Sequence, residues 1–307
     1  MTTTLAPHPG LRRRRLAVGT RRALIGWGFA LPFMALFLVF VAGPTLASLG
    51  MSFTDLTSRD VESPTNVNVV GIDNYTELFG DEQFRQAMIN TAYFVVVGVP
   101  LTMVLGLAAA VALNSGITRF RTFFRVGFYL PVVTSIVAVA VVWKLILQPD
   151  GLLNSLLDRV GIDGPNWLRD ERWAMPSLIV MAAWRNMGAL MVIFLAGLQT
   201  IPKDLYEASS LDGASAWKRF RYITLPLLRP TMLFAGVITG IGYLQFFEEP
   251  FVMTQGGPLD RTLSMSFFTY NQFGFGRYSF AAAAGYVLFV AIVVLTVLQF
   301  RLLRPKT

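Results

Sequence analysis

Six long apolar stretches constrain this chain more than any other feature of its sequence. They cover residues 23–50, 88–113, 126–147, 176–198, 230–254 and 280–300. About 20 apolar residues are enough to cross the hydrocarbon core of a bilayer, because a helix rises about 1.5 Å per residue and the core is roughly 30 Å thick. The sequence therefore predicts an all-α integral membrane protein with six transmembrane helices.

The composition agrees with a membrane protein and excludes several kinds of site. The 307 residues are 54% hydrophobic and 14% charged, whereas soluble domains carry about 25% charged residues. The chain has no cysteine, and its single histidine is His8. We therefore expect neither a metal site nor a Ser-His-Asp triad. The net charge of +8 is spread between the apolar stretches, which disfavours nucleic-acid binding.

The distribution of lysine and arginine predicts the orientation of the spans. Of these 26 residues, 17 lie in the two terminal segments and in the connections after the second and fourth stretches, and 7 lie in the other three connections. Cytoplasmic segments are usually the richer in Lys and Arg. We therefore expect both termini to be cytoplasmic and the two long connections, 51–87 and 148–175, to lie outside.

The connection 199–229 is longer than a turn between two membrane helices needs. Apolar residues recur at a spacing of three from Leu205 to Leu211, which predicts a short helix with one apolar edge. Gly213 permits the positive φ of a sharp reversal, and Pro226 is expected to end a second short helix. The residues alone favour either an amphipathic helix on anionic lipid or a docking surface for a cytoplasmic partner.

A spaced motif lies within this connection. Glu207-Ala208-Ser209 is followed by Gly213 and, after nine further residues, by Ile223-Thr224-Leu225-Pro226. This pattern resembles the EAA loop of binding-protein-dependent ABC importer permeases, with serine in place of the second alanine. Segments such as "LAGLQTIPKDLYEASSLDGA" and "MTQGGP" are similar to the carbohydrate-uptake branch of that family, in particular to the first permease subunit of the maltose and glycerol-phosphate type.

The resemblance implies a fold and a domain layout. Residues 88–300 are expected to form a MetI-like permease core with a type I ABC importer transmembrane domain, and the coupling loop 199–229 would form a cytoplasmic coupling-helix elbow. The other segments would be a basic cytoplasmic tail (1–22), a first transmembrane helix (23–50), an outer loop (51–87) and a cytoplasmic tail (301–307). The coupling residues would be Glu207, Ala208, Ser209, Leu211, Asp212, Gly213, Trp217, Phe220, Ile223, Leu225 and Pro226.

The resemblance also implies partners and a location. We expect a heterodimer with a second permease subunit, two nucleotide-binding ATPase subunits and an extracytoplasmic solute-binding protein, all at the bacterial cytoplasmic membrane. This chain has no GxxxxGK[ST] phosphate loop. It is therefore expected to be a non-catalytic subunit that binds no cofactor, while the partner ATPase uses ATP and Mg²⁺.

Four charged residues lie within the predicted spans, where charge is costly and usually functional. Lys144 can extend toward the interface, whereas Arg185 lies deeper and is expected to pair with Glu248 or Glu249. Such a pair would either lock the fourth and fifth spans together or line a polar cavity for sugar hydroxyls. The candidate pathway residues are Trp184, Arg185, Asn186, Tyr243, Gln245, Phe246, Glu248 and Glu249.

The predicted function is translocation of a sugar, a di- or oligosaccharide, delivered by a solute-binding protein. A glycerol-phosphate or other polyol importer is the alternative within the same family. A self-contained secondary transporter or channel is disfavoured because the chain shows no two matching halves. An intramembrane enzyme is disfavoured because HExxH and GxSxG motifs are absent.

Overall fold

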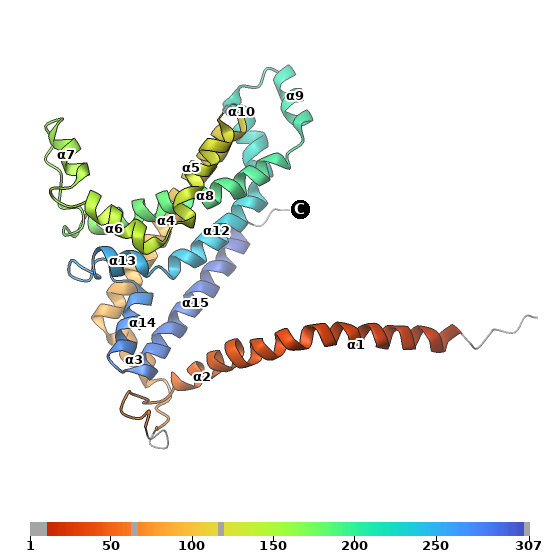
Figure 1. The fold of residues 1–307 in the computed structure, drawn as a ribbon, viewed down its shortest axis with the longest axis vertical. Coiled ribbons are helices and arrows are strands. Elements are labelled where there is room, and N and C mark those ends of the chain that lie inside the picture. Colours follow the sequence, from red (N-terminus) through yellow and green to blue (C-terminus); the bar gives the residue numbers. More distant parts are fainter. Residues whose placement is uncertain (1–10, 63–66, 116–119, 304–307) are drawn as a thin grey trace, which may run out of the picture.

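The computed structural model describes residues 11–62, 67–115 and 120–303, so much of the two predicted tails lies outside the described residues. Helices are the only regular elements of the described residues, apart from one isolated bridge between Thr54 and Val69, and irregular connections join them (Figure 1). The helices are α1 (Leu11–Phe37), η1 (Leu38–Ala42), α2 (Gly43–Met51), α3 (Asp73–Gly80), α4 (Glu82–Ser115), α5 (Arg121–Val133), α6 (Ile136–Ile146), α7 (Leu152–Asp158), α8 (Ala174–Gln199), α9 (Lys203–Leu211), α10 (Ala216–Arg219), η3 (Phe220–Thr224), α11 (Leu225–Leu227), α12 (Arg229–Leu244), α13 (Glu248–Met253), α14 (Met265–Gly274) and α15 (Tyr278–Leu303).

The membrane spans agree in number with the six predicted. Within the described ranges, 4 helices are long and apolar enough to cross a membrane, or 6 if each of two bent pairs is one span. The spans that pass as single helical segments are Ile25–Met51, Glu82–Asn114, Ala174–Gln199 and Tyr278–Arg301. The bent pairs supply the third and fifth spans, so the sequence predicted how many spans there are but not their shape.

The third span is broken, although the sequence predicted one continuous helix over 126–147. The helices α5 and α6 meet at an angle of 99°. Thr134 and Ser135 between them are extended, and the Thr134 hydroxyl donates a hydrogen bond of 2.9 Å to the Leu130 carbonyl. Pro131 lacks the N–H that would continue the hydrogen bonding of α5. The polar and proline residues between two apolar runs therefore end the helix.

The fifth span differs from the predicted helix 230–254 at both ends. Residues 216–227 and 229–244 are bent against each other by 67°, and Pro226 lies in the first turn of α11 instead of ending the preceding helix. At the other end α12 stops at Leu244, and α13 begins only at Glu248. This second break places the two glutamates of the span at the start of a short separate helix.

Helix α8 lies at the centre of the body, packed against α4 and α5 (Figure 1). Gly188 allows one close approach, because a Cβ there would lie 2.0 Å from the Phe128 carbonyl oxygen of α5. Small residues at such crossings let the backbones of membrane helices meet. The buried side chains form two clusters, one containing Phe84, Phe94 and Phe268, and the other containing Leu113, Phe194 and Leu228.

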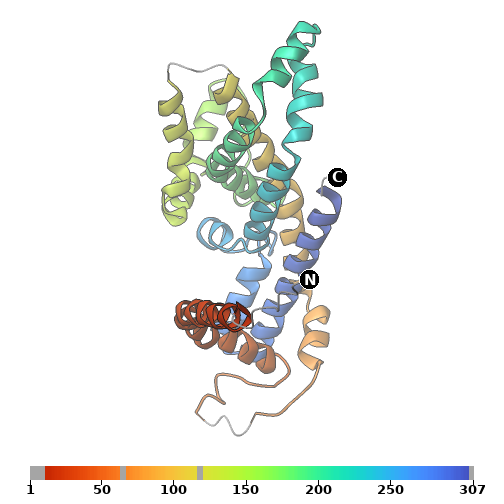
Figure 2. The same cartoon turned by 90° about the vertical axis from the view of Figure 1, so that its right-hand side faces the viewer.

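The two ends of the body are structurally different (Figures 1 and 2). At one end α9, α10, η3 and α11 form the elbow, residues 203–227. In Figure 1 the connection 52–72 lies at the bottom and the connection 147–173, which contains α7, lies at the upper left; we call these two connections, both away from the elbow, the loop end. Helix α1 extends away from the body (Figure 1), and none of the apolar window within Ile25–Met51 is buried. It begins at Leu11, inside the segment that the sequence assigned to a basic tail.

Candidate functional site

A central cavity of about 380 Å³ opens between α8, α12 and α13. It brings together seven of the eight pathway residues predicted from the sequence. The exception is Trp184, which packs against Trp143 with ring centroids 5.7 Å apart and lines a separate apolar groove. The residues lining the central cavity are Ile136, Arg185, Asn186, Ala189, Leu190, Ile193, Ile238, Thr239, Gly242, Tyr243, Gln245, Phe246, Glu248 and Glu249.

Arg185 does not form the ion pair expected from the sequence. Among the described residues, the salt bridges involve neither Arg185 nor the two glutamates. Its Nη1 instead donates a hydrogen bond of 3.3 Å to Asn186 Oδ1, while its Nε is buried without a partner. The sequence predicted this pair for a fifth span that is one helix over 230–254, whereas the break between α12 and α13 places the two glutamates on a separate short helix.

Glu249 is the second buried group at this site without a partner. Its side chain is 5% exposed, and its Oε2 accepts no hydrogen bond from the described chain. A buried polar atom left unsatisfied costs free energy, about 1–3 kcal/mol and more for a charged group. Two residues that line the cavity therefore each carry a buried polar atom, a guanidinium donor and a carboxylate acceptor, that the described chain leaves unsatisfied.

The aromatic wall of the cavity is held by packing. Tyr243 and Thr102 place their hydroxyl oxygens 2.7 Å apart, and Thr102 donates to the Gly98 carbonyl. Phe246 stacks on Phe94 with ring centroids 3.9 Å apart and planes at 4°. These contacts come from α4, so that helix fixes one side of the cavity although it does not line it. Thr239 also lines the cavity, although the sequence analysis did not single it out. A hydroxyl group inside an apolar span was the signal that could have identified it.

The elbow is built as a rigid reversal. Gly213 has φ +74°, and two hydrogen bonds close the turn, from Gly213 N to the Ser210 carbonyl at 3.1 Å and from Ala214 N to the Ser209 carbonyl at 2.9 Å. This is a Schellman ending of α9. Arg219 Nη1 donates to Ser210 Oγ at 2.7 Å and ties α10 back to α9. The predicted break at residues 212–213 is therefore where the chain reverses.

The predicted coupling residues divide into two groups by exposure. Leu211 is 90% exposed and Trp217 is 70% exposed, and the ring of Trp217 stacks on Phe220 with centroids 5.7 Å apart. The exposed members are Glu207, Ala208, Leu211, Asp212, Gly213 and Trp217. Ile223 packs against the cluster of Phe194 and Leu228 and so attaches the elbow to the body. The partly buried members are Ser209, Phe220, Ile223, Leu225 and Pro226.

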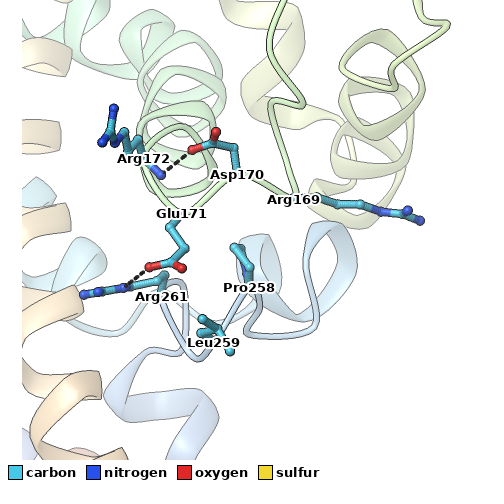
Figure 3. Close-up of a pocket in the computed structure, with 7 residues that line it drawn as sticks. All are labelled: Arg169, Asp170, Glu171, Arg172, Pro258, Leu259 and Arg261. Atoms are coloured by element: carbon cyan, nitrogen blue, oxygen red, sulfur yellow. Dashed lines mark hydrogen bonds and ion pairs between the residues drawn. The ribbon is translucent and has the colours of Figure 1, made fainter.

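A third feature is a hollow of about 890 Å³ on the loop end, which we call the loop-end surface (Figure 3). Two segments that are far apart in the sequence face each other there, 169–172 and 258–261. Arg261 Nε lies 3.1 Å from Glu171 Oε2 and joins them. Leu259 is 78% exposed at a φ of +47°, a region that non-glycine residues rarely adopt and that is frequent at functional sites.

Comparison with known proteins identifies relatives over nearly the whole chain. Residues 98–307 match the family model described as "Binding-protein-dependent transport system inner membrane component". The chain is 37% identical over 287 residues to the lactose transport system permease protein LacF of Rhizobium radiobacter, covering 92% of this chain and 94% of the relative. It is 34% identical over 282 residues to the arabinooligosaccharides transport system permease protein AraP of Bacillus subtilis, covering 89% and 87%.

Two solved structures are similar in fold. One is of a bacterial ABC transporter involved in the import of the acidic polysaccharide alginate, with a TM-score of 0.79, 28% identity and coverage of 95% of this chain and 99% of the other. The second is of a bacterial alginate ABC transporter in complex with an alginate pentasaccharide-bound periplasmic protein, with a TM-score of 0.78, 27% identity and coverage of 94% and 97%.

Proposed function

Because the chain belongs to the family of binding-protein-dependent transport system inner membrane components and is a permease subunit of an ABC importer, we propose that it translocates a sugar, a di- or oligosaccharide. The names of the relatives LacF and AraP support this substrate class. The observation that carries it is the central cavity.

The central cavity suits hydroxyl-rich ligands. Sugar hydroxyls both donate and accept hydrogen bonds, and the cavity offers donors and acceptors of both kinds. Arg185 Nε and Glu249 Oε2 are buried without partners, so a small movement of either side chain toward a bound hydroxyl group would satisfy a polar atom that now has no hydrogen bond. Tyr243 and Phe246 add aromatic surface against which the apolar face of a sugar ring can pack. A volume of about 380 Å³ lies within the range of roughly 300–1,000 Å³ found for ligand sites.

We propose that the elbow couples this chain to two nucleotide-binding ATPase subunits, which bind ATP and Mg²⁺. This chain would then be non-catalytic and bind no cofactor itself. Leu211 and Trp217 are apolar side chains exposed on one polar segment, as expected of anchors for a groove on a partner. Glu207 offers a carboxylate that an arginine can bind through two hydrogen bonds. The hydrogen bonds that close the elbow would let it move as one body.

The unburied helix α1 supports a second permease subunit as partner. Its apolar window has a mean hydropathy of 2.2 and no buried residue. Lipid alone can cover such a helix, but a helix held away from its own body also presents its whole circumference to a neighbouring subunit (Figure 1). We propose that it packs against a second, related permease in a heterodimer.

The loop-end surface is the proposed docking face for a solute-binding protein. The structure of the alginate relative was determined with its periplasmic protein bound. In this chain Arg169, Arg172 and Arg261 lie around the hollow with the exposed Leu259 (Figure 3). Arginine is one of the residue types in which binding hot spots are enriched. The loop end would then be extracytoplasmic, and the elbow and both termini cytoplasmic, in a bacterial cytoplasmic membrane.

Affinity purification of the tagged chain from its native membrane, followed by mass spectrometry, tests the assembly. We expect a second permease and a nucleotide-binding ATPase to co-purify. Thermal-shift screening of the cognate solute-binding protein against mono-, di- and oligosaccharides, polyols and amino acids tests the substrate. Selectivity for a non-carbohydrate would contradict the proposed substrate class, and purification of the chain alone would contradict the proposed assembly.

A further inference from the structure

A second polar cavity, of about 410 Å³, lies at the loop end between the end of α6, the segment before α8 and the end of α13. We call it the loop-end cavity. It is close in volume to the central cavity, but no residue lines both. Its polar lining comes from Lys144, Gln148, Asp150, Asn166, Arg169 and Thr254, together with the strained Gln255.

The loop-end cavity lies between two features already described. Arg169 lines both this cavity and the loop-end surface where we propose that the solute-binding protein docks. Helix α13 separates it from the central cavity, because Glu248 and Glu249 at the start of the helix line the central cavity and Met253 at its end lines this one. Six helical residues rise only about 9 Å. The loop-end cavity therefore adjoins the loop-end surface at Arg169 and the central cavity across α13.

The polar groups of the loop-end cavity are largely unused. The side chains of Gln148, Asp150, Asn166 and Arg169 make no hydrogen bond to another side chain or carbonyl within the described residues. Lys144 Nζ donates to the Val252 carbonyl at 3.3 Å, and an ammonium group has three donors. Lys144 therefore does not simply extend to the interface: it supports the end of α13 and keeps donors facing the cavity.

We propose that the loop-end cavity is a second carbohydrate subsite, which binds one sugar unit through its hydroxyl groups while the substrate passes from the loop-end surface to the central cavity. The inference rests on the proposed function, because it takes the substrate to be a sugar. Sugar hydroxyl groups both donate and accept hydrogen bonds, and the loop-end cavity offers both kinds of partner. The donors come from Lys144, Asn166 and Arg169, and the acceptors come from Gln148 and Asp150. An oligosaccharide can occupy both cavities, whereas a smaller sugar occupies them in turn.

The absence of cysteine from the chain gives a direct test. Asn166→Cys and Gln148→Cys each place one thiol in the loop-end cavity, and Val160→Cys places one on the same loop, 70% exposed and outside the lining of either polar cavity. The complete transporter, with its partner permease, ATPase and solute-binding protein, is reconstituted in vesicles and labelled with a membrane-impermeant maleimide. A panel of di- and trisaccharides that includes lactose and maltotriose supplies the probes, and uptake by the cysteine-free parent is measured with the same sugars.

With a transported sugar at about ten times its dissociation constant, labelling at positions 166 and 148 should slow about tenfold, because only the unoccupied fraction reacts. Labelling of Val160→Cys should not change. Uptake without protection at either position would overturn the second subsite and leave the proposed function intact. If the parent takes up no sugar of the panel, the proposed function fails and the subsite fails with it. Two positions are used so that one poorly folded variant does not decide the result.

Discussion

The hydroxyl oxygens of Tyr206 and Thr224 lie 2.8 Å apart, although the residues are 18 positions apart in the sequence. Tyr206 belongs to α9 and Thr224 ends η3, so this hydrogen bond joins the two arms of the elbow. Thr224 is buried and Tyr206 packs against the cluster of Phe194 and Leu228. The elbow is thus fastened both to itself and to the membrane body, as the proposed coupling to an ATPase subunit requires.

Tyr206→Phe should loosen the elbow without unfolding it. The substitution removes one hydrogen bond, which contributes about 1 kcal/mol, and leaves the Thr224 hydroxyl without its partner. We expect fewer sugar molecules transported per ATP hydrolysed, measured in vesicles with the assembled transporter. Tyr222→Phe is the matched control, since Tyr222 is 74% exposed and its ring is retained. If the two variants transport the same number of sugar molecules per ATP hydrolysed, the elbow does not need the hydrogen bond between Tyr206 and Thr224.

Gly213 should tolerate only residues that adopt a positive φ. Gly213→Val places a β-branched side chain at φ +74°, which costs about 1–2 kcal/mol, whereas asparagine enters this region more readily. A Cβ there meets no atom within 4 Å, so strain and not collision distinguishes the variants. We expect Gly213→Val to lower sugar-stimulated ATPase activity and co-purification of the ATPase, and Gly213→Asn to retain both. If Gly213→Val keeps its sugar-stimulated ATPase activity and still co-purifies with the ATPase, the sharp reversal at position 213 is not needed for coupling.

Arg185→Ala should impair uptake through the central cavity. A hydrogen bond from a charged group contributes about 1.5–3 kcal/mol, so kcat/KM for uptake should fall about 10- to 100-fold. Arg159→Ala, on the loop end and outside the central cavity, is the control. Sugar binding by the isolated solute-binding protein should be unchanged, because that step does not involve this chain. Normal uptake by Arg185→Ala would remove the central cavity from the substrate pathway.

Gly188→Ala should destabilise the helix bundle. The added Cβ would lie 2.0 Å from the Phe128 carbonyl oxygen, so α5 must move away from α8. Overpacking of this kind costs about 1–3 kcal/mol. Gly285→Ala is the control, because a Cβ at that helical position meets nothing within 4 Å. Thermal unfolding of the purified complex in detergent should show a lower midpoint for Gly188→Ala alone; equal midpoints would contradict the close crossing.

Arg172→Glu should weaken docking of the solute-binding protein. The side chain is exposed on the loop-end surface and takes no part in the ion pair between Arg261 and Glu171. Reversing its charge should raise the concentration of binding protein that half-stimulates ATPase activity, and added salt should reduce the difference by screening. Arg159→Glu provides the same charge change elsewhere on the loop end. Identical stimulation curves for the two variants would place the docking face elsewhere.

Much of the fold could be read from local sequence because the determinants are local. An apolar run long enough to cross a bilayer must be helical, whatever it packs against, so the number of spans was predictable. The reversal of the elbow was predictable at Gly213 for the same reason, since only neighbouring backbone geometry decides it. The family membership expected from the spacing of Glu207, Gly213 and Pro226 is confirmed by the match over residues 98–307.

What the sequence by itself determined is therefore the class of protein: a chain of apolar helices with one polar elbow. Only the tertiary structure decided where the charges of the spans lie. Local proline and polar residues mark where the third span breaks, but the 99° angle that its two halves adopt, and the position of α13 after its break, are set by packing between helices that are distant in the sequence. They leave Arg185 and Glu249 unpaired in one cavity, and they bring Lys144 to the Val252 carbonyl. Helical periodicity assumes an unbroken helix, and at these two breaks that assumption fails.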